Sequence, residues 1–169
     1  MTPLGIKGRA RVFGDDINTD YIITSRRKRE SLDPQILRQY LFEEIDPRFA
    51  ASLQPGDLIV AGKNFGCGSA MEVAVTAVVG AGVGAVLARG FSRTYYRNAI
   101  NNGLPPLICD TGSIREGDWL AIEDHNGILI RNVTTGQTIE AGALPRIMRE
   151  ILEAGGLAPY FRRRSFDAR

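Results

Sequence analysis

The sequence predicts a single compact α/β domain. Its 169 residues are the usual length of one domain. Short apolar runs bounded by Gly and Pro, which are typical of strands, alternate along the chain with stretches of helical periodicity. An Asn-Gly pair between two apolar runs predicts one β-hairpin. With 44% hydrophobic and 24% charged residues, the composition is that of a globular chain and excludes disorder as the main state.

The first part of the chain predicts a strand, a polar segment and a helix. Residues 9–13 are strand-like and end at a Gly-Asp-Asp turn. Residues 24–32 are almost wholly polar, so we expect a mobile loop there. Asp33 provides an N-cap, the proline after it suits the first helical position, and apolar residues follow helical spacing as far as Pro47. This pattern predicts an amphipathic helix of about three turns.

The middle of the chain predicts a strand–loop–helix–strand unit. Residues 57–62 form a short apolar run between chain breakers, which indicates a buried strand. The Gly-rich segment 64–69 follows directly, and good helix formers and valines then occupy residues 70–80. Glycines at 82 and 84 end this helix before a second apolar strand at 85–88.

The last part of the chain predicts two helices, a strand and the hairpin. A helix fits residues 92–102, and a strand fits residues 106–109. The hairpin is expected over residues 119–131, around the Asn-Gly turn. Residues 144–153 carry apolar side chains on one helical face and precede a Gly-Gly stop. The basic tail at 162–169 is expected to fray.

The charge and the cysteine count exclude several classes of protein. The 21 basic and 19 acidic side chains give +2, too little to indicate a nucleic-acid or membrane surface. Two cysteines, Cys67 and Cys109, are too few for a disulfide scaffold, an iron–sulfur cluster or a four-thiolate zinc site, so no metal bound by this chain alone is expected. The first residues lack the apolar run of a signal peptide, and no stretch reaches the ~18–20 apolar residues of a spanning helix. These features predict a cytoplasmic protein with no membrane partner.

The Gly-rich segment 64–69 is the first candidate site. Its two glycines let the backbone bend after a buried strand and are expected to place Ser69 at a helix N-terminus. Backbone amides and the helix dipole there would stabilise an anionic group or the alkoxide of Ser69. The alternative is that Ser69 only caps the helix and the glycines only form the turn. The segment matches neither a phosphate-binding loop nor a dinucleotide fingerprint.

The second candidate site is the basic run at 26–29, Arg-Arg-Lys-Arg. Arginine side chains suit carboxylates and phosphates, so a carboxylate-binding loop, a nucleic-acid contact and a solvated charged loop are all open. Aromatic residues of the kind that stack on RNA bases do not interleave with it. The one histidine, His125, adjoins the Asn-Gly pair and is interpreted as a turn residue rather than a catalytic base.

Several long motifs identify a family that the chain resembles. They are GDDINTD at 14–20, GKNFGCGS at 62–69, YRNAINNGLP at 96–105 and ILEAGGL at 151–157. Together they resemble the small subunit of isopropylmalate isomerase and homoaconitase, which is the detached swivel domain of the aconitase superfamily. The resemblance covers about residues 8–161 and leaves 162–169 as a basic tail.

The resemblance implies a fold, a partner and a reaction. The expected fold is the β/β/α swivel domain of aconitase, which closes over a large subunit with the active site between them. The large subunit is implied to hold a [4Fe–4S] cluster. The implied reaction isomerises a 2-hydroxy di- or tricarboxylate by dehydration and rehydration, while iron binds the hydroxyl as a Lewis acid. No nucleic-acid partner is implied.

The resemblance also implies roles for individual residues. Ser69 matches the family's serine base and is the predicted catalytic residue. The predicted substrate-binding residues are Arg26, Arg27, Arg29, Gly68, Ala70 and Met71. The predicted supporting residues, for which a purely structural role is the alternative, are Thr19, Asp20, Asn64, Gly66, Arg97 and Asn98.

The chain departs from the family pattern directly after the serine. The family usually continues Ser-Arg-Glu-His, whereas this chain continues Ala70, Met71, Glu72, Val73. Met71 cannot donate the hydrogen bonds of the arginine it replaces, so either the arginines at 26–29 bind the carboxylate or the substrate presents an alkyl group there. Isopropylmalate is the default substrate, and another alkylmalate such as dimethylmalate, or homoaconitate, is the alternative. A non-catalytic module that binds nucleic acid or regulates is the alternative of another class.

Overall fold

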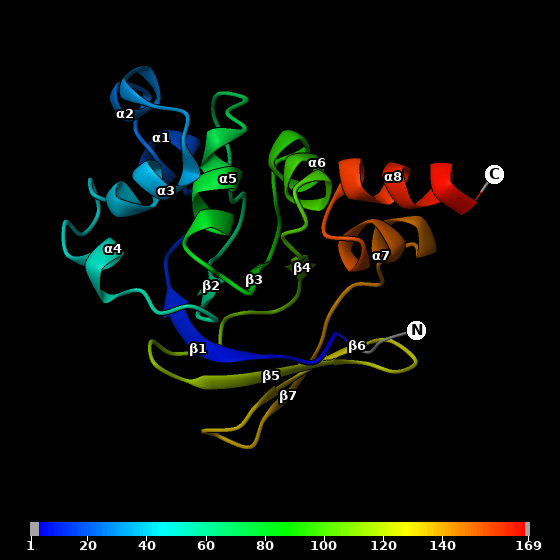
Figure 1. Ribbon diagram of the computed structural model, residues 1–169. Coiled ribbons are helices and arrows are strands. Elements are labelled where there is room, and N and C mark those ends of the chain that lie inside the picture. Colours follow the sequence, from blue (N-terminus) through cyan, green and yellow to red (C-terminus); the bar gives the residue numbers. More distant parts are fainter. Residues whose placement is uncertain (1–3, 168–169) are drawn as a thin grey trace.

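A curled, mixed sheet organises the chain. The computed structural model describes residues 4–167, with seven strands in the order β4-β3-β2-β1-β5-β6-β7 (Figure 1). The strands are β1 (Ile6–Val12), β2 (Leu58–Val60), β3 (Ala85–Ala88), β4 (Pro106–Ile108), β5 (Trp119–Asp124), β6 (Ile128–Asn132) and β7 (Thr138–Glu140). Strands β1 to β4 run parallel, whereas β5, β6 and β7 are each antiparallel to their neighbours.

Strand β1 joins the two halves of this sheet. Its first residues pair with β5, and its last three pair with β2. At the far edges, Ala141 after β7 forms an antiparallel bridge with Cys109 after β4. The N–H of Gly142 also donates to the carbonyl of Ile108 at 2.8 Å. The two edges therefore meet, which protects backbone groups that an open edge would expose.

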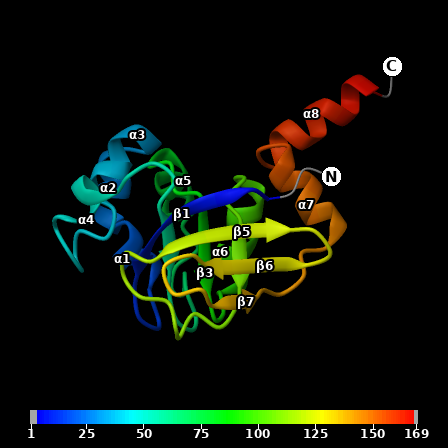
Figure 2. The ribbon, with the colours of Figure 1, turned by 90° about the horizontal axis from the view of Figure 1, so that it is seen from below.

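The helices lie on the side of the sheet away from the antiparallel strands (Figure 1). They are α1 (Thr19–Ile22), α2 (Ser25–Glu30), α3 (Pro34–Leu37), the 3₁₀ helix η1 (Arg38–Tyr40), α4 (Phe49–Ser52), α5 (Val73–Gly80), α6 (Arg93–Asn101), α7 (Arg146–Glu153) and α8 (Leu157–Asp167). In a view from below, β1, β5, β6 and β7 lie in front (Figure 2). Among residues 4–167, no helix is long and apolar enough to cross a membrane.

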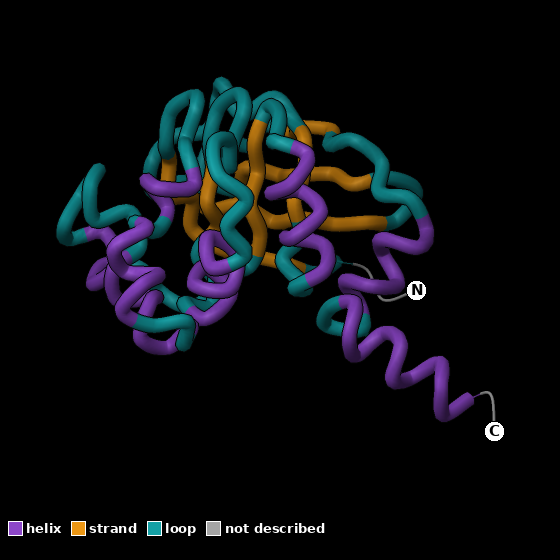
Figure 3. Tube along the Cα trace, turned by 90° about the horizontal axis from the view of Figure 1, so that it is seen from above, coloured by secondary structure: helices purple, strands orange, loops and turns teal. Residues whose placement is uncertain are grey.

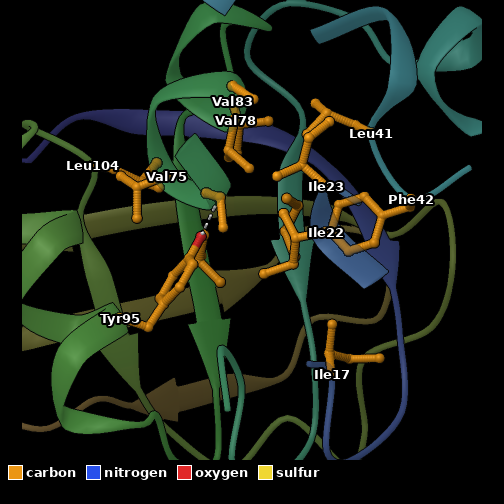
Figure 4. Close-up of a cluster of buried hydrophobic side chains, with 14 of the residues drawn as sticks. Ile17, Ile22, Ile23, Leu41, Phe42, Val75, Val78, Val83, Tyr95 and Leu104 are labelled. Carbon is orange, nitrogen blue, oxygen red and sulfur yellow. Dashed lines mark hydrogen bonds between the residues drawn. The ribbon is translucent and has the colours of Figure 1, made fainter. Parts of the chain in front are cut away.

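Alternate side chains of the parallel strands serve two separate cores. Ile59 and Val86 point toward the helices and belong to the cluster drawn in Figure 4, which includes residues of α1, α5 and α6. Leu58, Val60 and Leu87 point the other way and pack with β5, β6 and α7. This alternation follows from the two-residue period of a strand, and it separates the core under α1, α5 and α6 from the core that contains α7 and the antiparallel strands.

Most predicted elements are confirmed. The predicted strands correspond to β1 to β4, the hairpin to β5 and β6, and the last predicted helix to α7. Asp33 caps α3 by accepting from the N–H of Gln35 at 2.9 Å. Ser92 caps α6 in the same way, since its Oγ accepts from the N–H of Tyr95 at 3.2 Å.

The predicted three-turn helix after Asp33 is wrong. Helix α3 ends at Leu37, one 3₁₀ turn follows, and Phe42 then adopts a φ of 56°. Leu41 and Phe42 are both fully buried, and Phe42 stacks on Phe13 with ring centroids 4.2 Å apart. A positive φ cannot continue a right-handed helix, so the chain leaves the helix before Phe42, whose side chain packs on Phe13 in the core.

Two segments predicted to be irregular are helical instead. Residues 24–32 contain α2, which begins where the Thr24 hydroxyl accepts from the N–H of Arg27 at 3.3 Å. The tail expected to fray continues α8 as far as Asp167, and residues 168–169 lie outside the described part. Arg164 donates to the Tyr160 hydroxyl at 2.9 Å, a contact one turn back that favours the helix. Elements α1, α4 and β7 were not predicted.

Asp57, at the start of β2, is a buried carboxylate held by several donors. It accepts from Arg9 at 2.8 Å and from the N–H of Gln54 at 3.0 Å, and Arg11 lies at 3.4 Å. Burial raises the pKa of Asp57, but the hydrogen bonds and the charge of Arg9 together lower it more, so the pKa lies below its ordinary value. A carboxyl of this kind stabilises the fold above its unfolded-state pKa of ~3.9, and the effect is lost as the pH falls through the folded-state value.

We expect Asp57→Asn to lower the free energy of unfolding at pH 7 by about 2 kcal/mol, because the buried Arg11 loses a charged partner. This difference from the wild type should shrink as the pH falls below about 4, because the Asp57 carboxyl of the unfolded wild-type chain takes up a proton there, before that of the folded chain. Urea unfolding at pH 7 and at pH 3 measures both values. An equal difference at the two pH values would contradict the role given to this charge.

Candidate active site

The loops that follow the parallel strands meet along one edge of the sheet (Figure 3). Backbone hydrogen bonds join them. The N–H of Gly62 donates to the carbonyl of Gly14 at 3.0 Å, and the N–H of Phe65 donates to the carbonyl of Gly90 at 2.9 Å. The carboxyl ends of parallel strands are where α/β folds commonly bind ligands, so this edge is the candidate position of the site.

The Gly-rich segment that ends at Ser69 lies beside the chain that follows β1. The N–H of Thr19 donates to the carbonyl of Cys67 at 2.8 Å, and the Thr19 hydroxyl donates to the carbonyl of Ser69 at 2.9 Å. The Asn64 amide donates to the Asp16 carboxylate at 3.0 Å. The structure therefore brings together three predicted site residues from two distant parts of the sequence.

Two glycines make this close approach possible. Gly66 and Gly68 have φ values of 78° and 91°, in the left-handed region that favours glycine. A Cβ on Gly66 would lie 2.2 Å from the Tyr95 ring, and a Cβ on Gly68 would lie 2.6 Å from the Asn18 side-chain amide. Both positions therefore require glycine for reasons of conformation and of space.

Ser69 is exposed, and polar groups that have no partner surround it. Within residues 4–167, no group forms a hydrogen bond with the Ser69 hydroxyl. The backbone N–H groups of Gly68, Ser69 and Ala70 likewise reach no acceptor in the described chain, and all three residues are exposed. Successive free amides of this kind favour a negatively charged oxygen.

Ser69 does not stand at a helix N-terminus, contrary to the prediction. Helix α5 begins at Val73, and the first amides of its initial turn are occupied, because the N–H of Ala74 donates to the carbonyl of Met71 at 3.1 Å. A helix capped at Ser69 would use the Ser69 carbonyl as its first acceptor. In the structure the Ser69 carbonyl accepts from the Thr19 hydroxyl, and the helix starts later, at Val73.

Met71 packs inside this chain. Its side chain is 4% exposed and belongs to the core cluster beneath the helices. The Ser25 hydroxyl lies 3.9 Å from its sulfur, and Ser25 in turn donates to the Asp20 carboxylate at 2.6 Å. Met71 thus links the segment around Ser69 to Ser25 at the start of α2, and Asp20 contacts the same serine.

The arginines of α2 differ in their surroundings. Arg26 is exposed, and its nearest carboxylate is Glu43 at 3.9 Å. Arg27 donates to both oxygens of Glu43, at 3.0 and 3.1 Å, and to Glu30 at 3.0 Å. Arg29 is exposed and makes no hydrogen bond or ion pair with any residue from 4 to 167. Two of the three arginines therefore present their guanidinium groups outward.

The two remaining candidates, Arg97 and Asn98, lie on different sides of helix α6. Tyr95 contacts Gly66, and Asn102 donates to Glu72 at 3.3 Å, so the helix face between them lies against the site segment. Asn98, one turn from each, is on that face. Arg97 lies instead at a hollow of about 520 Å³ between α6 and α7, with mainly apolar neighbours, and is not brought to the segment around Ser69.

The other titratable candidates lie apart from this segment. His125 is exposed in the turn between β5 and β6, as predicted, with Nε2 3.7 Å from Glu123. Burial, with a smaller effect of Asp110, raises the pKa of the Cys109 thiol to about 12, so it stays protonated at neutral pH. The described residues contain no group of three or more His, Cys, Asp or Glu side chains placed to hold a metal ion.

Comparisons with known proteins identify the family. Residues 39–112 match the model of the aconitase C-terminal domain. The chain is 46% identical to the 3-isopropylmalate dehydratase small subunit 1 of Methanopyrus kandleri, over 94% of this chain and 93% of that protein. The chain belongs to the family of 3-isopropylmalate dehydratase and homoaconitase small subunits.

Two further relatives agree with this family. The methanogen homoaconitase small subunit of Methanocaldococcus jannaschii is 46% identical over 94% of this chain and 92% of its own. The crystal structure of a 3-isopropylmalate dehydratase from the same organism superposes with a TM-score of 0.91, at 44% identity, over 96% of both chains. The predicted family and the predicted swivel-type α/β fold are confirmed.

The sequence patterns missed several residues that shape this small-subunit site. Asn18 caps α1, since its side chain accepts from the N–H of Asp20 at 2.9 Å, and Asn-Thr-Asp before an apolar pair is a signal for such a cap. Tyr95 fills the space beneath Gly66. Ser25 and Glu43 had no signal in the sequence, because each acts through a contact that depends on the tertiary fold.

We expect Gly68→Ala to lower the free energy of unfolding by about 2–3 kcal/mol, because the new methyl group meets the Asn18 amide and the backbone keeps a positive φ. Gly117→Ala is the matched control, since Gly117 has a similar φ of 85° and open space around its Cβ position. The control should show the smaller loss that conformation alone causes, about 1 kcal/mol. Equal losses in urea unfolding would show that contact with Asn18 is unimportant.

Proposed function

We propose that this chain is the small subunit of an aconitase-type hydro-lyase, with isopropylmalate as the default substrate. The observation that carries the proposal is the exposed Ser69 hydroxyl among the free amides of Gly68, Ser69 and Ala70. The names of the relatives support the class of reaction. The enzyme is complete only with a large subunit, as the name "small subunit" of these relatives implies.

Ser69 acts as the base in this proposal. The reaction removes a proton from a carbon next to a carboxylate, and a serine does this only as its alkoxide. The free amides beside it supply hydrogen bonds to that oxygen, in place of the helix N-terminus expected from the sequence. The contacts of Thr19 with Ser69 and Cys67 fix the loop, so the oxygen keeps its position during proton transfer.

The iron–sulfur cluster belongs to the large subunit in this proposal. Within residues 4–167 no side-chain group is placed to bind a metal, Cys67 is half-buried, and Cys109 is buried and protonated. In the complete enzyme the cluster supplies a Lewis acid for the hydroxyl group of the substrate. The residues of this chain hold the substrate and move the proton.

Arg26 and Arg29 bind a substrate carboxylate in this proposal. They lie three residues apart on α2 and therefore share a side of the helix, and both are exposed. The buried Met71 offers no charge and little surface, so the carboxylate role of the family's arginine passes to α2. Dimethylmalate and homoaconitate are the alternative substrates, and a panel of malates decides among them.

A nucleic-acid-binding role has less support. Glu43 and Glu30 neutralise Arg27, the central arginine of the basic run. Phosphate binding would also weaken steeply with rising salt. Tight, salt-sensitive binding of RNA by this chain would favour that role over the hydro-lyase.

We expect Ser69→Ala to reduce turnover on the order of a thousandfold while the complex with the large subunit still assembles, because the base is lost and the fold is not. Ser113→Ala, at another exposed serine, is the matched control and should keep full activity. Dehydration of each malate is followed anaerobically by absorbance, and assembly by gel filtration. Turnover retained in Ser69→Ala would remove Ser69 as the base.

We expect Arg29→Gln and Arg26→Gln each to raise KM for the preferred malate by about tenfold or more, because each removes one charge-assisted hydrogen bond to a carboxylate. Lys28→Gln removes the same charge from α2 at a position on another side of the helix and should change KM by less than about twofold. Steady-state kinetics of the assembled enzyme tests this. Equal effects of all three variants would indicate a general charge effect without a specific contact.

A further inference from the structure

Helix α2 contributes no buried side chain to either core. Apolar packing therefore does not hold it in place, although the segments on both sides of it are well packed. The residues that do hold it are polar. Ser25 at its start donates through its hydroxyl and its N–H to the Asp20 carboxylate, at 2.6 and 3.1 Å. The rest of the helix is held mainly by the side chain of Arg27, since Arg26 approaches Glu43 only to 3.9 Å.

Four residues form the Arg27 cluster, namely Arg27, Glu30, Tyr40 and Glu43. The guanidinium donates to both oxygens of Glu43 and to Glu30, and its carbon lies 3.7 Å from the centroid of the Tyr40 ring. The Arg27 and Glu43 side chains are 20% and 19% exposed. Paired geometry and partial burial make such a contact stronger than an ordinary surface ion pair. The hydrogen bonds that Arg27 donates to Glu43 and Glu30 also raise its pKa, so it remains charged.

Glu43 belongs to a part of the chain that does not move easily. It follows Leu41 and Phe42, which are both fully buried. The N–H of Phe42 donates to the carbonyl of Ile22 at 3.0 Å. The Glu43 carboxylate is thus a fixed point on the core, and Arg27 connects α2 to it.

We propose that Arg27 and Glu43 are positioning residues, which hold α2 so that Arg26 and Arg29 meet the substrate carboxylate. The inference rests on the proposed function, in which those two arginines bind the substrate. It assigns Arg27 a role within the protein, because all three guanidinium nitrogens of Arg27 already donate to Glu43 or Glu30. The fold of the two cores does not depend on this contact, since α2 adds no side chain to them.

The other end of α2 connects this cluster to the reacting group. Ser25 lies 3.9 Å from the Met71 sulfur, and Met71 is two residues from Ser69. Asp20, which holds Ser25, follows Thr19, whose hydroxyl holds the Ser69 carbonyl. The position of α2 relative to Ser69 is therefore set at one end by Ser25 and at the other by Arg27.

The first test uses the chain alone and needs no substrate. Glu43→Gln keeps the shape of the side chain and removes its charge, and Glu44→Gln is the matched control, because Glu44 is exposed and has no partner among the described residues. We expect amide hydrogen exchange in α2, measured at Lys28 and Ser31, to quicken about tenfold in Glu43→Gln and not in Glu44→Gln. Exchange in α6 should be unchanged in both. Unchanged exchange in α2 would overturn the proposal, whatever the activity of the enzyme.

The second test uses the enzyme assembled with its large subunit. We expect Glu43→Gln and Arg27→Gln each to raise KM about tenfold with kcat within about twofold, because the base is intact and the carboxylate contact is loosened. The double variant should be no worse than the more affected single variant, since both remove one contact. Arg27→Lys should recover only part of the loss, because an ammonium group cannot bond both oxygens in parallel.

The outcomes separate this proposal from the proposed function. Faster exchange in α2 with an unchanged KM for every malate would overturn the positioning role and leave Ser69 as the base. Additive effects of the two single variants would also overturn it, since they would show independent roles. Full turnover in Ser69→Ala, by contrast, overturns the proposed function and leaves the exchange result to decide whether Arg27 holds α2.

Discussion

Thr19 and Cys67 are hydrogen-bonded neighbours because strands β1 and β2 run parallel and end at the same edge of the sheet. The rest of the candidate site follows from this pairing. It brings the Thr19 hydroxyl to the carbonyl of Ser69, beside the amides of residues 68–70, which have no partner in the described chain, and ahead of α5, which starts at Val73. It also fixes where α1 begins, and therefore where the chain enters α2. A change in the register of β1 and β2 would move all of these groups together.

The site has two parts that are held by different kinds of interaction. Backbone hydrogen bonds, the Thr19 hydroxyl and two glycines with positive φ fix the segment around Ser69. Side-chain contacts of Ser25 and Arg27 hold α2, and these contacts change with single substitutions. Met71 lies between the two parts, against Ser25. An apolar residue there closes the core under the site, whereas a buried arginine would need a charged partner.

Much of the fold could be predicted from the sequence because the relevant signals are local. Asp33 and Ser92 cap helices with their own side chains, and the apolar runs of β2 and β3 are short enough to be strands only. The failures occur where a distant residue takes part. The Ser69 carbonyl accepts from the distant Thr19 hydroxyl and α5 starts only at Val73, and the expected helix ends before Phe42, whose φ is positive and whose side chain stacks on Phe13. For the site, the motifs indicated Ser69 and its neighbours, but not that Arg97 lies apart from them.

The polar composition of residues 24–32 has a physical reason once the two parts of the site are distinguished. In the proposed function this segment presents the exposed Arg26 and Arg29 to a negatively charged substrate, and it cannot be buried, because burial of such charges is costly. It also cannot be left free, because ordering it on binding would reduce affinity. A short helix capped by Thr24 and held by Arg27 meets both requirements, since its one neutralised arginine supplies the order and its two exposed arginines remain available. The polar composition that led us to expect a loop at residues 24–32 is therefore what the binding role proposed for α2 requires.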